Sequence, residues 1–167
     1  MSITAALLFF ASVLAHEMAH SLVAKARGIP VRSITLHLFG GVSDIQREPD
    51  SPGHEFVMAI LGPVTSFVIG GTLIAVVLLG SSQTAIMQNP NQALAGLGPV
   101  FTILLWLGIV NVTVGAFNLV PGFPLDGGRI LRSILWAVTG NLRRATRWAS
   151  WAGQGIAWLM IGSGIAM

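Results

Sequence analysis

Long apolar stretches alternate with short charged segments along the chain. No Asp, Glu, Lys or Arg occurs between Phe56 and Leu125, a run long enough for two membrane crossings of about 20 residues each. Together with the apolar stretches at both ends of the chain, this pattern predicts four transmembrane helices, at roughly residues 3–26, 56–79, 94–120 and 148–167. The expected fold class is therefore an all-α polytopic membrane protein, in which residues 1–167 form a single transmembrane domain.

The pattern changes between the first two apolar stretches. The segment "VRSITLHLFGGVSDIQ" is rich in β-branched residues and partly alternates apolar and polar positions, with Gly40 and Gly41 at its centre. Such a pattern is typical of two short strands, so we expect a small membrane-associated β-hairpin at roughly residues 31–47. After Gly128, the segment "RILRSILWAVTG" predicts a short amphipathic helix that ends at Gly140.

Composition and charge narrow the class of protein. Only 9% of the residues are charged, against about a quarter in a soluble domain, so a soluble fold is excluded. The basic residues lie mainly between the first and second and between the third and fourth expected spans. Because positive residues favour the cytoplasm, we expect the N-terminus outside and both basic segments inside the cell membrane. The absence of cysteine excludes disulfides and thiolate metal sites.

The first apolar stretch carries ionisable residues near its inner end, in "HEMAH". On a helix, His16 and His20 share one face, so both imidazoles can bind one ion. This is the H-E-x-x-H spacing of zinc hydrolases, in which the glutamate is the general base. Glu17 would take the proton of the attacking water and later deliver it to the leaving amine. An acidic residue in a membrane costs about 3 kcal/mol and usually marks function.

Asp126 is the expected third ligand, since zinc needs three protein ligands and an open position. It is the only acid after Glu55, and it follows the third span on the side where the first span ends. An aspartate here could instead cap the following helix, but its shared depth with the two histidines favours the ligand role. Zinc is inferred from the ligand types, and two imidazoles with a carboxylate also suit iron.

The pair of motifs "HEMAH" and "NLVPGFPLDGG" resembles the site-2 protease family of intramembrane zinc metalloproteases. The intervening "LFGGV" and "LGPVTS" match the order of that family's core, in a compact branch without a PDZ insertion, and we expect the chain to be truncated. The resemblance implies one Zn²⁺ held by His16, His20 and Asp126, with Glu17 as catalytic acid and base. It also implies that Asn118 assists substrate or transition-state binding.

These inferences predict a zinc-dependent endopeptidase that cleaves transmembrane segments of other membrane proteins. Its surroundings are the lipid bilayer, its active site lies towards the cytoplasmic side, and nucleic acid is not a partner. Part of residues 34–44, including Gly40 and Gly41, is expected to hold an extended substrate by main-chain hydrogen bonds, or alternatively to plug the membrane surface. Two other functions stay open, a catalytically silent relative that binds membrane segments and a divalent metal transporter lined by the same three ligands.

Overall fold

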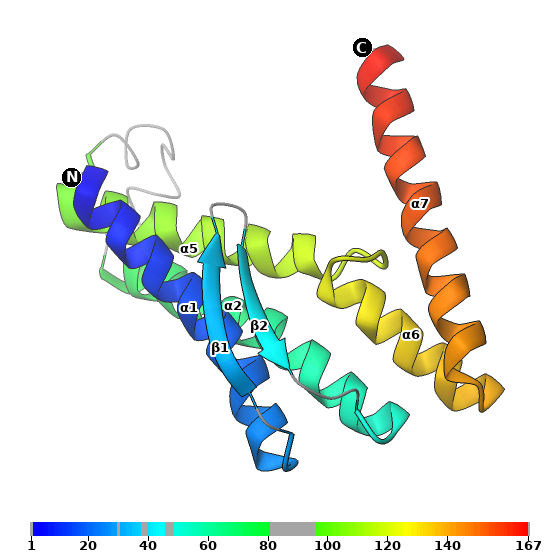
Figure 1. Ribbon diagram of the computed structural model, residues 1–167. Coiled ribbons are helices and arrows are strands. Elements are labelled where there is room, and N and C mark those ends of the chain that lie inside the picture. Colours follow the sequence, from blue (N-terminus) through cyan, green and yellow to red (C-terminus); the bar gives the residue numbers. More distant parts are fainter. Residues whose placement is uncertain (1, 30, 38–39, 46–48, 81–95, 167) are drawn as a thin grey trace.

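The computed structural model describes residues 2–29, 31–37, 40–45, 49–80 and 96–166. In chain order the elements are helix α1 (Ser2–Ala26), strands β1 (Val31–His37) and β2 (Gly40–Ile45), and helices α2 (Pro52–Gly80), α5 (Pro99–Asn118), α6 (Asp126–Thr139) and α7 (Leu142–Ala166). Helices α1, α2 and α5 lie together, the two strands lie along α1, and α7 projects away from the other helices (Figure 1).

Three described helices are long and apolar enough to cross a membrane, at Ile3–Ala26, Pro52–Gly80 and Pro99–Asn118. The expectation of four spans is therefore wrong for the described part of the chain. Residues 148–167 belong to α7 except for Met167, which lies outside the described residues, as do residues 94 and 95 of the expected third span. The stretch lacks charge, but Gln154 and repeated glycines and serines make it less apolar than the other three helices.

The two strands form an antiparallel pair in which His37 lies opposite Gly40 and Val31 opposite Ile45. The register is interrupted between Val31 and Ile34. Residues 38–39, which join the strands, lie outside the described residues. The expected fold class, an all-α protein with four spans and a membrane-associated hairpin, is thus wrong. The described residues form three candidate spans, one two-stranded sheet and two further helices.

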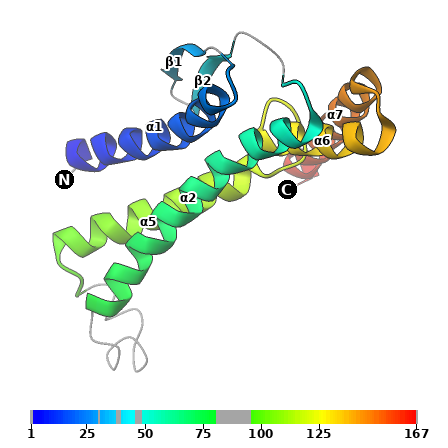
Figure 2. The ribbon, with the colours of Figure 1, turned by 90° about the horizontal axis from the view of Figure 1, so that it is seen from below.

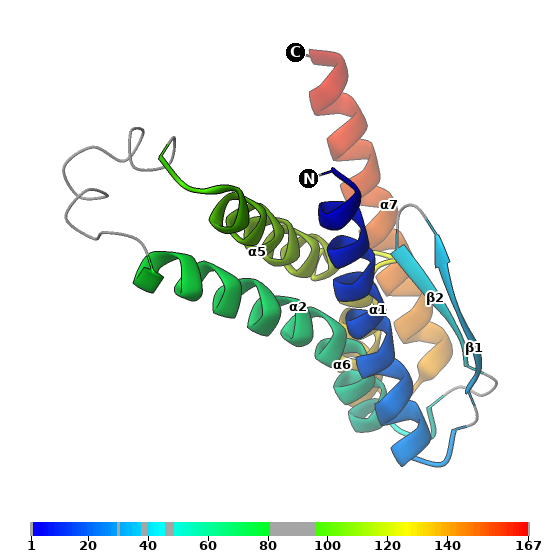
Figure 3. The ribbon, with the colours of Figure 1, turned by 90° about the vertical axis from the view of Figure 1, so that its left-hand side faces the viewer.

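Helices α1 and α2 lie close together near the end of α1 and diverge towards the N-terminus (Figure 2). Helices α2 and α5 run side by side (Figure 3). Their backbones approach closely at two glycines, since a Cβ on Gly70 would lie 2.7 Å from the carbonyl oxygen of Gly108. Small residues allow such close approach in lipid, where apolar surface alone does not drive helices together.

The short helix expected after the third span is confirmed as α6. It ends at Thr139 and is capped by Gly140, whose φ of 63° is a left-handed conformation that glycine adopts without steric cost. The helix begins at Asp126, three residues before Arg129, where the expected segment starts. Leu125 is its N-cap residue and makes no side-chain capping hydrogen bond.

Helix α7 docks through small residues in its first half. Ala145 and Ala149 are fully buried, and a Cβ on Gly153 would lie 2.9 Å from Cα of Gly122 and 3.0 Å from the backbone nitrogen of Phe123. From Trp158 to Ile165 the large apolar side chains of α7 are exposed. The Gly153–Gly122 contact therefore joins α7 to the loop that precedes α6.

Gly153→Ala should destabilise the protein, because the new methyl group meets backbone atoms that cannot rotate away. Overpacking of this kind costs about 1–3 kcal/mol. Unfolding of detergent-solubilised protein, followed by circular dichroism, measures the change. Gly155→Ala is the matched control, since a Cβ at Gly155 meets nothing within 4 Å. Equal stability of the two variants would contradict the contact.

Candidate metal centre

His16 and His20 lie on one face of α1, one helical turn apart, and each is only 3% exposed. Nε2 of His16 lies 3.1 Å from Oδ2 of Asp126, and Nε2 of His20 lies 3.3 Å from the same oxygen. Ligand atoms of the three residues all lie within 4.8 Å of one another. The fold thus brings the three expected ligands together, although Asp126 is 106 residues or more from either histidine in the chain.

Helix α2 orients both imidazole rings through their other nitrogen. Nδ1 of His16 lies 2.9 Å from Oγ of Ser66. Nδ1 of His20 donates to the main-chain carbonyl of Met58 at 2.6 Å. Metal-binding histidines commonly have such partners, which fix the direction in which the ligand nitrogen points. Here the partners turn both Nε2 atoms towards Asp126.

The hydrogen bond from His20 to Met58 determines whether the other ring nitrogen of His20, Nε2, can donate or accept a hydrogen bond. A carbonyl oxygen only accepts, so Nδ1 carries the proton and Nε2 of the neutral ring is an acceptor. Nε2 is buried and has no hydrogen-bond partner, because its approach to Asp126 is close but not aligned for one. A positive charge between this nitrogen and the carboxylate oxygen stabilises such a pair, and either a proton on Nε2 or a metal ion can supply it. Two imidazole nitrogens and a carboxylate oxygen that converge in this way fit a metal site.

Gly62 of α2 makes room for both rings. A Cβ at this position would overlap Nε2 of His20 and lie 2.6 Å from Nε2 of His16. Gly62 is itself buried, and the two imidazoles lie against its bare backbone. Any larger residue would displace the ligand nitrogens.

Two glycines place Asp126 at the start of α6. A Cβ on Gly128 would lie 2.6 Å from the backbone of Gly122 and Phe123, and one on Gly127 would overlap the carbonyl oxygens of the preceding loop. The first turn of α6 therefore packs directly beneath that loop. Asp126 uses its carboxylate to contact the histidines instead of serving as the N-cap.

The carboxyl group of Asp126 stays ionised. Burial alone would raise its pKa, but the hydrogen bond of His16 and the close, positively charged forms of His16 and His20 act in the opposite direction and lower the pKa to about 2. A permanently charged carboxylate beside two imidazoles suits a divalent cation, which binds deprotonated ligands.

The other expected site residues lie around this cluster. Glu17 is half-buried on α1 next to His16. Asn118 is the last residue of α5, and its side-chain nitrogen donates to the carbonyl of Val114 at 3.0 Å, so its amide binds its own helix. Gly40 and Gly41 begin β2, in the sheet beside α1. Their proposed roles in substrate binding stay predictions.

The residues that support the ligands were not recognised from the sequence. Gly62 and Ser66 both belong to "LGPVTS", and Met58 precedes it by one turn. The available signal was the spacing of 58, 62 and 66, which places three positions on one helix face. Nothing local indicates that this face meets α1.

Comparison with known proteins agrees with the geometry. The chain matches peptidase family M50 over residues 4–95 and 81–162. It is 45% identical over 159 residues to sll0528 of Synechocystis sp. and 38% identical over 155 residues to MJ0392 of Methanocaldococcus jannaschii, both named as zinc metalloproteases. These matches cover 95% and 93% of this chain but only 38% and 41% of the relatives, so the chain spans about two fifths of their length.

A solved structure, the site-2 protease from Methanocaldococcus jannaschii, is similar with a TM-score of 0.70 and 36% sequence identity. The similarity covers 96% of this chain and 66% of that one. Three helices of the present chain are long and apolar enough to cross a membrane, so the chain is an integral membrane protein. With a family match along nearly all of its length and a converging His, His and Asp cluster, the chain belongs to peptidase family M50, the family of the site-2 proteases.

Proposed function

We propose that the chain is the catalytic part of a zinc-dependent intramembrane endopeptidase that cleaves transmembrane segments of other membrane proteins. The observation that carries this proposal is the convergence of His16, His20 and Asp126, with a buried imidazole nitrogen left without a donor. The zinc metalloprotease names of the relatives support the choice of metal and of reaction.

Two imidazoles and one carboxylate are a ligand set found in zinc hydrolases, in which a fourth position stays open. When bound, zinc lowers the pKa of a water molecule and polarises the substrate carbonyl. His16, His20 and Asp126 hold the ion, while Ser66 and the carbonyl of Met58 keep the rings in place.

Glu17 is the proposed general base and acid. Its carboxylate takes a proton from the water whose oxygen attacks the carbonyl carbon of the scissile peptide bond. When the C–N bond breaks, Glu17 returns that proton to the amine nitrogen of the leaving fragment. Its half-buried position beside His16 suits a group that must reach both water and substrate.

The active site is proposed to lie towards the cytoplasm. His16 and His20 lie in the second half of α1, which ends near Lys25 and Arg27. Positive residues favour the cytoplasmic side of a membrane, and the basic residues of α6 and the start of α7 follow Asp126 in the chain. All three proposed ligands meet at one point, which supports hydrolysis over the ion path that a transporter would need.

Substrate capture is proposed to involve the sheet beside α1. A helical substrate hides its peptide bonds in its own hydrogen bonds, so it must unwind before cleavage. Strands β1 and β2 each have one edge that is not used for pairing with the other, and an extended peptide can bind such an edge through main-chain groups. The contact of both strands with α1 supports a binding edge near the metal centre.

Glu17→Gln should abolish cleavage while zinc stays bound. Loss of a general base lowers rates by about 10²- to 10⁴-fold, and Glu17 is not among the proposed ligands. The experiment co-expresses each form with tagged single-span membrane proteins, detects fragments and measures zinc in the purified protein. Asp126→Asn is the contrasting variant, because it should lose metal as well as activity. Zinc in the wild type without any fragments would favour the silent binder, and no zinc in the wild type would overturn the proposal.

Gly62→Ala should weaken zinc binding strongly, because the methyl group and the two ligand nitrogens cannot occupy the same space. Removal of groups that support metal ligands lowers metal affinity by about 10- to 100-fold. We expect Gly62→Ala to lower the zinc affinity by at least that factor. Competition with a chelator measures the affinity. Gly71→Ala on the same helix is the control, since a Cβ there meets nothing within 4 Å. Unchanged affinity in Gly62→Ala would mean that the rings do not bind metal in the observed arrangement.

Proline substitutions at Val42 and Ser43 test the strand edge. Neighbouring residues of a strand point their N–H groups to opposite edges, so one proline breaks the pairing of β1 with β2 and the other removes only an outward donor. Cleavage should fall with both variants while bound zinc is unchanged. Full cleavage by both would exclude capture at β2.

A further inference from the structure

The first turn of α2 contains a fully buried acidic residue that the proposed mechanism does not use. Glu55 is 0% exposed, and its Oε1 accepts a hydrogen bond from Nε of Arg132 on α6 at 2.6 Å. A terminal guanidinium nitrogen of Arg132 contacts the same oxygen, and the arginine side chain is only 12% exposed. Two charges have thus been taken out of water at the junction of α2 and α6.

Stability alone does not explain such a pair. The desolvation of two buried charges costs several kcal/mol per ion, and replacement of a buried pair by apolar residues of similar volume is often neutral or stabilising. A guanidinium fixed by more than one nitrogen does provide direction, because its donors form a rigid planar fork. The pair therefore suits a task of orientation.

Glu55 lies on the face of α2 that supports the metal ligands. Positions 55, 58, 62 and 66 follow one another at three- and four-residue spacing, so they share one side of the helix. Three of them hold or accommodate the rings of His16 and His20. The fourth holds α6, which carries the remaining ligand. One face of α2 thus supports both parts of the metal centre, the two histidines of α1 and the aspartate of α6.

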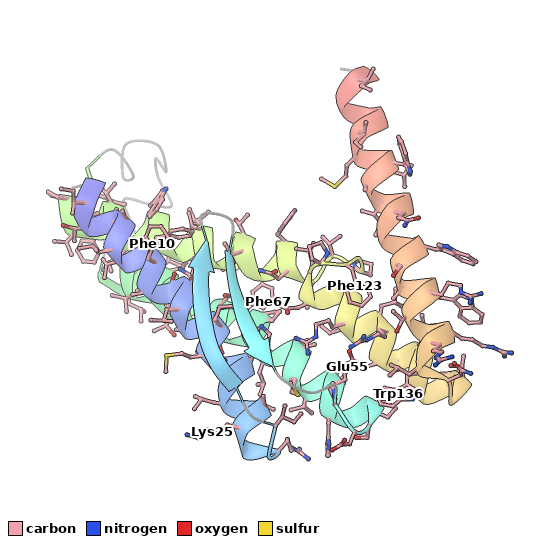
Figure 4. All side chains as sticks on the ribbon, viewed as in Figure 1. Phe10, Lys25, Glu55, Phe67, Phe123 and Trp136 are labelled. Carbon is pink, nitrogen blue, oxygen red and sulfur yellow. The ribbon has the colours of Figure 1, made fainter. Side chains whose placement is uncertain are left out.

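Arg132 also reaches the loop in front of Asp126. Its guanidinium carbon lies 5.6 Å from the ring centroid of Phe123, a cation–π distance. Phe123 precedes Asp126 by three residues, and both Phe123 and Glu55 lie beside α6 (Figure 4). Arg132, which follows Asp126 in the chain, therefore connects α6 both to α2 and to the loop that precedes Asp126.

We propose that Glu55 and Arg132 are positioning residues that set Asp126 against His16 and His20 and so determine the metal affinity of the site. The inference rests on the proposed metal site and adds the part that fixes its third ligand. Asp126 contacts both histidines through one oxygen. A shift of α6 along α2 would therefore remove the carboxylate from both rings at once.

The test replaces the ion pair by an apolar pair, Glu55→Leu with Arg132→Met, in the whole chain. Three quantities are measured in detergent: thermal unfolding, the zinc dissociation constant by chelator competition, and the electronic spectrum of bound Co²⁺. We expect the double variant to keep its helical content and thermal stability but to bind zinc about 10- to 100-fold more weakly. The Co²⁺ spectrum should change as well, because the carboxylate ligand moves.

Arg132→Lys is the second variant, since it keeps a positive charge beside Glu55 but loses the planar fork and the ring contact. It should fold and show weaker zinc binding in the same direction. Arg143→Met removes an exposed arginine of α7 and is the matched control, with zinc binding unchanged. A folded double variant with the affinity and Co²⁺ spectrum of the wild type would overturn the inference while leaving the metal site intact. A wild type that binds neither ion would overturn the metal site itself.

Discussion

Polar groups buried in an apolar helix bundle must find partners within the protein, and in this chain one face of α2 supplies them. The hydroxyl of Ser66 and the carbonyl of Met58 meet the two imidazoles, and the carboxylate of Glu55 meets Arg132. A buried donor or acceptor left alone costs about 1–3 kcal/mol. The positions of α1 and α6 against α2 are therefore restricted by these directional contacts as well as by apolar packing, which by itself would permit sliding.

The same face of α2 also has to leave space. Gly62 lies between the polar positions, and any side chain there would occupy the place of the imidazole nitrogens. Gly70 likewise lets the backbone of α2 approach Gly108 of α5 closely. Gly127 and Gly128 let the start of α6 pack against the preceding loop. Because lipid tails are as apolar as leucine, close approach and hydrogen bonds take the place of the hydrophobic effect in holding such helices together. The glycines and the polar residues of α2 thus act together: the former set how close neighbouring elements come, and the latter set where along the helix they stop.

Local patterns in the sequence were sufficient to predict which three side chains come together. His16 and His20 follow from helical spacing, and Asp126 follows from the order of apolar and charged segments. The supporting contacts could not be predicted in this way, because Ser66 is 50 residues from His16 and Arg132 is 77 residues from Glu55. No periodicity reports which residues of two distant helices will face each other. The error in the fourth span has a different origin. Absence of charge alone does not make a membrane helix, because Gln154 and the small residues of α7 leave it less apolar than the three candidate spans.

The two histidines differ in how firmly their orientation is fixed. His20 donates from Nδ1 to a carbonyl that can only accept, so its protonation pattern has one solution and Nε2 always presents a lone pair when the ring is neutral. His16 faces a hydroxyl, which both donates and accepts. Nε2 of His16 can therefore donate to Asp126 while Nδ1 accepts from Ser66, or Nδ1 can donate to Ser66 while Nε2 presents a lone pair. Both hydrogen-bond patterns of His16 are compatible with the same ring position. His20 would present a fixed ligand nitrogen to a metal ion, and Ser66 would let His16 do the same once its Nε2 proton is lost.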